Sequence, residues 1–200
     1  MKQQFLDKKT LAIIKEKKEL RTQFKLQREQ LNETQIKQKS QLIAEQVLNL
    51  AEFKKAKNIM CYVSKDNEVA THDLIKKILT MNKTLAVPLI VKKGIMKPAI
   101  IKSFSELRLA DFNTLQPTAS RLLEDKIDLN LMPALAVTKT GDRLGWGGGF
   151  YDRFMMSNQA QLNLVLAFDC QIAEQLPTTE FDQKVDGIIT ESQLFFLDRA

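Results

Sequence analysis

The chain has 200 residues, of which 44% are hydrophobic and 27% are charged, and its formal net charge is +6 at pH 7. A chain of this length can bury one sizeable core, so we expect a single domain over residues 1–200. No apolar run approaches the about 20 residues that a membrane span requires, and the first residues lack the hydrophobic region of a signal peptide. The composition therefore excludes a membrane-spanning protein and predicts a cytoplasmic one with no membrane partner.

The excess of positive charge lies in the N-terminal part of the chain. Residues 1–58 hold 14 Lys and Arg against 7 Asp and Glu, whereas the remainder is nearly balanced. Such a segment can bind nucleic acid or an anionic small molecule, but a solvated helix face is the commoner cause. We interpret most of these lysines as solvated.

Residues 1–56 are expected to form helices that pack on an α/β core. Apolar side chains recur at helical spacing between charged ones, which predicts one helix over residues 6–31 and a second that begins near Asn32 or Thr34. The apolar positions are Ile13, Leu20, Phe24, Leu31, Ile36, Ile43, Val47 and Leu50.

Short apolar runs beyond residue 58 predict strands that alternate with helices. Pro88 places its strand at an edge, at a bulge or at the strand's own end, and Pro133 interrupts another strand. The pattern over residues 92–120 is the least clear. Apolar strands that alternate with helices predict a largely parallel sheet covered on both faces. The predicted strands cover residues 59–63, 85–91, 99–101, 128–137, 162–168 and 185–190, and the predicted helices cover residues 71–79 and 150–156.

The two cysteines, Cys61 and Cys170, lie far apart in apolar stretches, and His72 is the chain's one histidine. Because there is no CxxC spacing, these residues do not predict a zinc site. We expect both thiols to be free and buried, and His72 to be structural.

Four of the chain's seven glycines fall within residues 145–149, between Arg143 and Arg153. Clustered glycines let successive backbone N–H groups turn toward an anion, and the helix predicted from residue 150 would place its N-terminus there. The run matches neither GxGxxG nor GxxxxGK[ST], so it predicts neither a dinucleotide fold nor a Walker loop. We favour an anion site, with phosphate as the candidate, over a turn that only satisfies tight geometry.

Three predicted loops, residues 64–70, 138–152 and 177–184, follow the carboxyl ends of strands, where open α/β sheets bind ligands. Asp152 and Asp182 could contact Mg²⁺ directly or through water, although either aspartate alone would more often be a helix cap or a surface charge.

Lys17 and Arg21 are four positions apart, so they share one helix face and could grip a phosphate, although an isolated pair of this kind is usually solvated. Trp146, Phe150 and Tyr151 could stack on a flat heterocycle or pack the loop. No Ser/His/Asp or Cys/His pair is apparent, so we do not expect covalent catalysis by the protein.

Four segments resemble the 5-formyltetrahydrofolate cyclo-ligase family, also called methenyltetrahydrofolate synthetase, over nearly the whole chain. The segment from Gly141 to Arg153 is the most specific of the four. The resemblance implies an open three-layer α/β/α fold with a mostly parallel sheet, similar to those of ribose-phosphate isomerases and CoA transferases. The four segments are residues 17–21, 62–71, 141–153 and 168–191.

The same resemblance implies ATP-dependent closure of 5-formyltetrahydrofolate to 5,10-methenyltetrahydrofolate through phosphorylation of the formyl oxygen, with release of ADP and phosphate. Magnesium would be held by Asp152 and Asp182, and Arg143 and Tyr151 would be catalytic. The folate pocket would be lined by Val63, Glu68, Trp146 and Tyr151. The implied ATP-binding residues are Lys17, Arg21, Arg143, Leu144, Gly145, Trp146, Gly147, Gly148, Gly149, Phe150 and Tyr151.

Phe181 departs from the family pattern, because many members have His there. Two alternatives differ in class: a basic nucleotide- or nucleic-acid-binding module without catalysis, and a sugar-phosphate isomerase on a related fold. The first predicts a steep salt dependence of DNA or RNA affinity, but the mixed charge and the lack of interleaved aromatic residues argue against it. The second needs a general base and no ATP. We expect a monomer that binds folate and ATP and no nucleic acid.

Overall fold

The computed structural model of the chain describes residues 7–118, 121–157 and 160–197. The helices are α1 (Lys8–Glu29), α2 (Glu33–Asn49), α3 (Ala51–Lys55), α4 (His72–Leu79) and α5 (Phe150–Met156), with short 3-10 turns η1 (Phe104–Glu106), η2 (Asp111–Asn113) and η3 (Asp169–Gln171). The strands are β1 (Asn58–Cys61), β2 (Thr84–Lys92), β3 (Ile95–Ile100), β4 (Leu107–Ala110), β5 (Thr114–Pro117), β6 (Ile127–Pro133), β7 (Ala136–Thr138), β8 (Arg143–Leu144), β9 (Ala160–Leu166), β10 (Ile172–Ala173), β11 (Gly187–Ile189) and β12 (Leu194–Phe196).

Local caps explain where the first two helices begin. The Asp7 side chain accepts a hydrogen bond of 2.7 Å from the backbone N–H of Thr10, and Asn32 forms a capping box with Gln35. Each cap satisfies N–H groups that have no partner within the helix. The prediction of two helices separated near Asn32 is confirmed; residue 6, where we expected the first to begin, lies outside the described residues.

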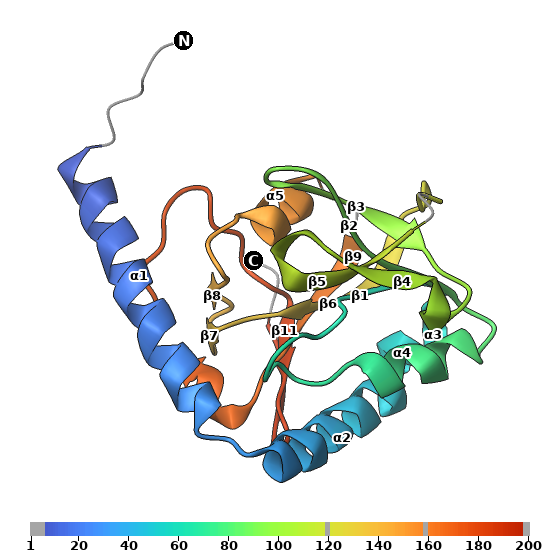
Figure 1. The fold of residues 1–200 in the computed structure, drawn as a ribbon. Coiled ribbons are helices and arrows are strands. Elements are labelled where there is room, and N and C mark those ends of the chain that lie inside the picture. The colour runs from blue at the N-terminus through green and yellow to red at the C-terminus, as the bar shows by residue number, and fades with distance from the viewer. Residues whose placement is uncertain (1–6, 119–120, 158–159, 198–200) are drawn as a thin grey trace.

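The main sheet has the strand order β12-β11-β9-β6-β1-β2-β3 (Figure 1). The pairs β1/β2, β1/β6, β6/β9 and β9/β11 are parallel, and the outer strands β3 and β12 pair antiparallel with their neighbours. The predicted, largely parallel sheet is therefore confirmed. Pro88 lies in β2 beyond Ala86, the last residue that pairs with β1, so its missing N–H removes no hydrogen bond on that side.

Alternate side chains of the central strand β1 enter two different layers, as the two-residue period of a strand requires. Ile59 and Cys61 pack in a cluster with Ile75 of α4, whereas Met60 packs with Phe154 of α5. In Figure 1, α2, α3 and α4 lie along one side of the sheet and α5 lies on the other. In the described part of the chain, α5 is a short helix, and a small sheet, β10-β7-β8, also covers this second side, where Val137 of β7 packs against Met132 and Val165.

Helix α1 covers this small sheet rather than the main one. Phe24 of α1 packs with Ala136 of β7, Leu144 of β8 and Ala173 of β10. Figure 1 shows α1 beside β7 and β8. The helix thereby lies next to the glycine loop that follows β8. None of the described helices has the length and apolarity that crossing a membrane requires. That the whole chain forms one domain stays a prediction.

Two expectations need correction or completion. Cys61 is buried, as predicted, but Cys170 is exposed. Phe168 and Gln171 beside it are buried, whereas the Cys170 side chain faces outward, so the expectation that it is buried was wrong. The region 92–120 gave no clear pattern; its described part, residues 92–118, contains β3, which pairs with β2, and the antiparallel β4/β5 hairpin, while residues 119–120 lie outside the described residues.

Candidate active site

Two cationic side chains of helix α1, Lys17 and Arg21, tie it to two of the three predicted loops. The ammonium of Lys17 pairs with the carboxylate of Asp182, in the loop before β11. Arg21, one turn later, donates a hydrogen bond of 2.8 Å from Nε to the carbonyl oxygen of Gly145. The predicted pair of cations is therefore not solvated, and it lies beside the glycine loop.

The glycine loop has a conformation that side chains would disturb. Gly147 has φ +95° and Gly149 has φ +63°, in the left-handed region that favours glycine. A Cβ atom on Gly147 would lie 3.3 Å from Cζ of Arg21. Within the described residues, the N–H groups of Gly147, Gly148 and Gly149 donate no hydrogen bond. Free N–H groups beside a cation at the start of α5 fit a phosphate.

Arg143 is the most enclosed cation of the loop, with a side chain only 3% exposed. Its NH2 atom lies 3.2 and 3.3 Å from the two carboxylate oxygens of Asp152. Its Nε atom is buried and has no hydrogen-bond partner among the described residues. A buried donor without a partner is costly, and such donors are often found where a ligand completes the site.

Tyr151 lies between the layers and contacts three apolar clusters. Its ring centroid lies 5.3 Å from Cζ of Arg143. Burial raises the pKa of the Tyr151 hydroxyl well above its usual value, and the nearby Glu68 raises it further. The hydroxyl therefore stays protonated at neutral pH, so it can donate a hydrogen bond but cannot act as a base.

The two predicted magnesium ligands, Asp152 and Asp182, each already have a cationic partner. Asp182 Oδ2 accepts hydrogen bonds from Lys17 and from the N–H and hydroxyl of Thr179. Burial alone would raise the pKa of Asp182, but these hydrogen bonds outweigh it and lower the pKa. Phe181 is exposed and does not take part in holding the carboxylate.

Both aspartates lie close enough to Arg21 for their charges to act on its guanidinium. Among residues 7–118, 121–157 and 160–197, no group of three or more His, Cys, Asp or Glu side chains could hold a metal ion. Magnesium usually binds one or two carboxylates together with water and substrate phosphates. The residues present therefore fit a magnesium ion that arrives with ATP phosphates, rather than one caged by protein ligands alone.

The predicted folate side of the site centres on Glu68, which is 5% exposed. Its carboxylate accepts hydrogen bonds of 3.1 Å from the N–H of Lys65 and 3.0 Å from Nε1 of Trp146. Burial raises the pKa of Glu68, whereas these hydrogen bonds and the charge of Arg28 act in the opposite direction. Val63 is buried at the start of the same loop. The hydrogen bond between Glu68 and Trp146 joins the folate side to the glycine loop.

Two residues of the predicted loop serve packing in the structure. The side chain of Leu144 is buried against Phe24, and Phe150 packs edge-on against Phe112 with ring centroids 5.6 Å apart. Sequence reasoning missed Arg28, whose guanidinium lies 5.4 Å from the Trp146 ring. Its position seven residues after Arg21, on the same face of α1, was a signal that could have found it.

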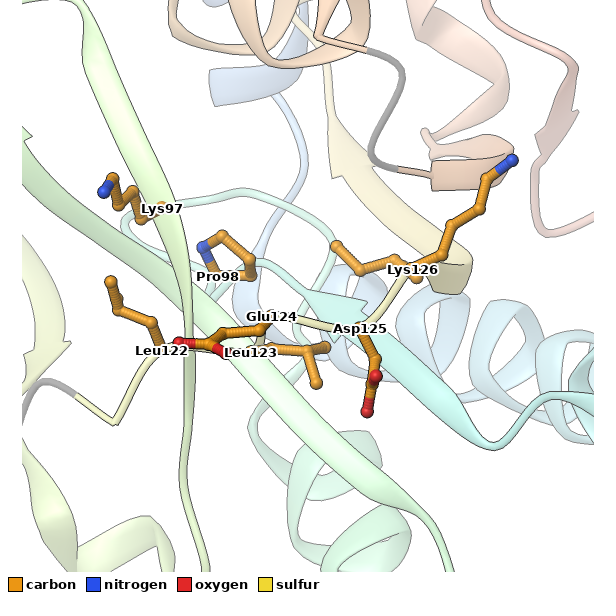
Figure 2. A pocket seen from close by; sticks show the side chains of 8 residues that line it. Lys97, Pro98, Leu122, Leu123, Glu124, Asp125 and Lys126 are labelled. Atoms are coloured by element: carbon orange, nitrogen blue, oxygen red, sulfur yellow. The ribbon is translucent and has the colours of Figure 1, made fainter.

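The described part of the chain also has a hollow away from these loops, and it contains none of the predicted site residues. It measures about 540 Å³ and lies where the chain enters β6, at the amino end of that strand. Figure 2 shows the ammonium groups of Lys97 and Lys126 pointing away from one another, so the two charges do not converge on a ligand. Its lining residues are Lys97, Pro98, Leu122, Leu123, Glu124, Asp125, Lys126 and Ile127.

Comparison with known sequences decides the family. The profile of the 5-formyltetrahydrofolate cyclo-ligase family matches residues 13–191. The chain belongs to this family. The 5-formyltetrahydrofolate cyclo-ligase of Haemophilus influenzae is 31% identical over 181 residues, which cover 86% of this chain and 96% of that protein. The mouse 5-formyltetrahydrofolate cyclo-ligase is 28% identical over 189 residues, which cover 88% of this chain and 93% of that protein.

Solved structures agree with the family assignment. The NMR structure of Aquifex aeolicus 5,10-methenyltetrahydrofolate synthetase superimposes with a TM-score of 0.82 at 27% identity and covers 92% of this chain and 94% of that one. A 5,10-methenyltetrahydrofolate synthetase from Mycoplasma pneumoniae, at 23% identity and a TM-score of 0.71, shares the fold. The predicted cyclo-ligase resemblance and fold class are confirmed, and neither the non-catalytic module nor the isomerase is favoured.

Proposed function

We propose that this cyclo-ligase family member converts 5-formyltetrahydrofolate to 5,10-methenyltetrahydrofolate with ATP as co-substrate and with release of ADP and phosphate. The observation that carries the proposal is the convergence of α1, the glycine loop and the Glu68 loop around Trp146 and Arg143. One side of this site offers cations and free N–H groups, which suit phosphates. The other offers a buried carboxylate and aromatic rings, which suit a folate.

On the ATP side, Lys17, Arg21 and the N–H groups of Gly147 to Gly149 would bind phosphate oxygens. Arg143 would neutralise the charge that develops on the transferred phosphoryl group, with Asp152 holding its guanidinium in position. Magnesium, when bound with ATP through Asp152 and Asp182, would neutralise further phosphate charge. This division of labour is what phosphoryl transfer requires, because the transition state is stabilised mainly by positioning and charge.

On the folate side, the substrate itself would supply both nucleophiles. The formyl oxygen attacks the γ-phosphorus of ATP and ADP leaves, which forms an iminophosphate. The neighbouring amine of the folate then attacks the formyl carbon, and phosphate leaves as the ring closes. The protein would contribute positioning by Val63, Glu68, Trp146 and Tyr151. This scheme fits a site without an activated Ser or Cys nucleophile.

The test is the appearance of the near-ultraviolet absorbance of methenyltetrahydrofolate when purified protein is mixed with 5-formyltetrahydrofolate. We expect product only when Mg-ATP is also present, together with one ADP for each methenyltetrahydrofolate. Folded protein that makes no product with Mg-ATP contradicts the proposal. Three further properties stay predictions: a cytoplasmic location, a monomeric state and no binding of nucleic acid. Light scattering would check the monomeric state, and a DNA-binding titration at low salt would check the lack of nucleic-acid binding.

A further inference from the structure

Arg28 is a cation in an unusual position, in the last turn of α1. The residue is 1% exposed, and its Nε donates a hydrogen bond of 2.9 Å to the side-chain oxygen of Asn67. Its NH1 and NH2 atoms are buried and have no hydrogen-bond partner among the described residues. A purely structural arginine would normally use most of its five donors, so the arrangement suggests another role.

The surroundings of Arg28 indicate that role. Its guanidinium lies 5.4 Å from the ring centroid of Trp146, within the range of a cation–π interaction. Trp146 in turn donates its indole N–H to Glu68. Arg28 forms no ion pair with a described carboxylate, yet its charge acts on Glu68 and that of Glu68 on Arg28. The indole therefore links a buried cation to a buried anion.

Trp146 is also the exposed member of this group, because 43% of its surface is accessible. A large aromatic side chain at the surface of a loop would be mobile without contacts to hold it. Here its N–H is fixed by Glu68 and its ring lies near Arg28 and, at 5.3 Å, near the ammonium of Lys65. These contacts order the side chain before any ligand arrives, which lowers the entropic cost of binding.

We propose that Arg28 is a positioning residue of the folate pocket, where it holds the indole of Trp146 and the carboxylate of Glu68 in the arrangement that receives 5-formyltetrahydrofolate. The inference rests on the proposed function, because it takes Glu68 and Trp146 as folate contacts. It adds that α1, which carries Lys17 and Arg21 for ATP, also shapes the folate side.

The first readout needs no turnover, because Trp146 is the chain's one tryptophan. Titration of wild-type protein with 5-formyltetrahydrofolate in the absence of ATP should change its fluorescence and give a dissociation constant. In Arg28→Met we expect a dissociation constant about tenfold higher, as loss of one interaction of about 1.4 kcal/mol requires. Lys25→Met is the control, because Lys25 is an exposed cation on the same helix, and it should bind as wild type does.

The second readout is kinetic. In Arg28→Met the KM for 5-formyltetrahydrofolate should rise by a similar factor, while the KM for ATP and kcat stay within about twofold of wild type. Loss of uniform binding of one substrate has this signature, whereas a general disturbance of the fold would lower kcat and affect both substrates. Equal KM values for folate in Arg28→Met and wild type overturn the proposal.

The third readout is the pH profile, which a merely structural role would not move. The charged and titratable groups that act on or sense Glu68 are Arg28 from α1, Lys65 from its own loop, Tyr62 after β1 and Tyr151 from α5. Removal of the Arg28 charge raises the pKa of Glu68 further, so the acid limb of folate binding should move to higher pH. An acid limb that stays at the wild-type pH overturns the proposal.

Arg28→Lys keeps the charge and guards against a folding failure of Arg28→Met. We expect its acid limb to match wild type and its folate affinity to lie between those of wild type and Arg28→Met. In a Glu68→Gln background the titrating carboxyl is absent, so Arg28→Met should cause no shift in the pH dependence of folate binding. A limb that moves equally in both backgrounds shows that Arg28 does not act through Glu68 and overturns the proposal.

The two proposals fail separately. Wild-type protein that binds 5-formyltetrahydrofolate but makes no product with Mg-ATP contradicts the proposed reaction and leaves the fluorescence test of Arg28 intact. Wild-type protein that turns over, combined with unchanged folate binding in Arg28→Met, overturns only the role of Arg28.

Discussion

The ammonium of Lys17 and the carboxylate of Asp182 form an ion pair across 165 positions of sequence. Both side chains are largely enclosed, and the pair fastens α1 to the loop before β11. It also joins a predicted phosphate ligand to a predicted magnesium ligand. Binding of Mg-ATP would therefore exchange this contact for contacts with phosphate oxygens and metal.

Asp182→Asn should weaken the binding of Mg-ATP without weakening the binding of folate. Removal of one of two carboxylates lowers the attraction for magnesium, so we expect the magnesium concentration for half-maximal activity to rise by about tenfold. Activity measured against magnesium at fixed ATP checks this, with folate binding expected to stay unchanged. Asp73→Asn is the control, since Asp73 is an exposed carboxylate in an ion pair with Lys76. A magnesium dependence that matches wild type contradicts a metal role for Asp182.

Lys17→Met should alter the acid stability of the protein. The folded pKa of Asp182 is depressed, so its ionisation stabilises the fold above its unfolded pKa, and this contribution is lost as pH falls through the folded value. Without Lys17, the pKa of Asp182 in the folded protein is lowered by less. The stability difference between wild type and Lys17→Met should therefore be largest near neutral pH and narrow below the ordinary aspartate value of 3.8. Urea unfolding of both proteins from pH 7 to pH 3 measures this difference in the free energy of unfolding. A difference that increases as the pH falls would refute the role of Lys17 in lowering the pKa of Asp182.

Arg143→Lys should reduce turnover far more than stability. Lysine keeps the positive charge but lacks the planar guanidinium, whose NH2 contacts both oxygens of Asp152 while its NH1 contacts the carbonyl oxygen of Pro133. Loss of one preorganised charge donor in a transition state commonly costs about 100-fold in kcat. Turnover and thermal unfolding should be measured together, with Arg108→Lys, on the exposed side of β4, as the control. Wild-type kcat in folded Arg143→Lys removes the catalytic role.

Gly147→Ala should strain the glycine loop and displace the neighbouring guanidinium of Arg21. A non-glycine residue in the left-handed region costs roughly 1–2 kcal/mol, and the new Cβ would press on the guanidinium of Arg21. We expect a lower melting temperature and a KM for ATP that rises several-fold. If the melting temperature falls while the KM for ATP does not change, the loop is a structural turn and not a phosphate cradle.

Regular elements were predictable where one local signal dominates. The bounds of α5 agree with the prediction, because the run of glycines up to Gly149 disfavours a helix and the helix begins at the next residue, Phe150. The two N-terminal helices followed from apolar spacing and from the cap at Asn32. The β4/β5 hairpin could not be predicted in this way, because exposed apolar residues such as Leu109 break the alternation of buried apolar and exposed polar side chains.

The site was predictable in part, because parallel strands bring their carboxyl ends, and hence their loops, to one edge of a sheet. That geometry accounts for the meeting of Glu68 with Trp146. The seven-residue spacing places Arg28 on the same helix face as Arg21, but it does not predict the burial of Arg28, since an arginine in a charged helix is ordinarily solvated. Its burial depends on the angle at which α1 crosses the small sheet, and sequence spacing does not specify that angle.

The geometry of helix α1 sets the distances between its cationic side chains. Lys17, Arg21 and Arg28 lie on the same face of it, and the last two are separated by about 10 Å of helix rise. The distance between Arg21, predicted to bind phosphate, and Arg28, which lies near the indole of Trp146, is therefore fixed by a count of seven residues. An inserted residue between Lys25 and Leu26 would turn Arg28 by about 100° away from Trp146 while Lys17 and Arg21 stayed in place. In the proposed site, the pitch of this single helix would thus set the distance between the ATP phosphates and the folate.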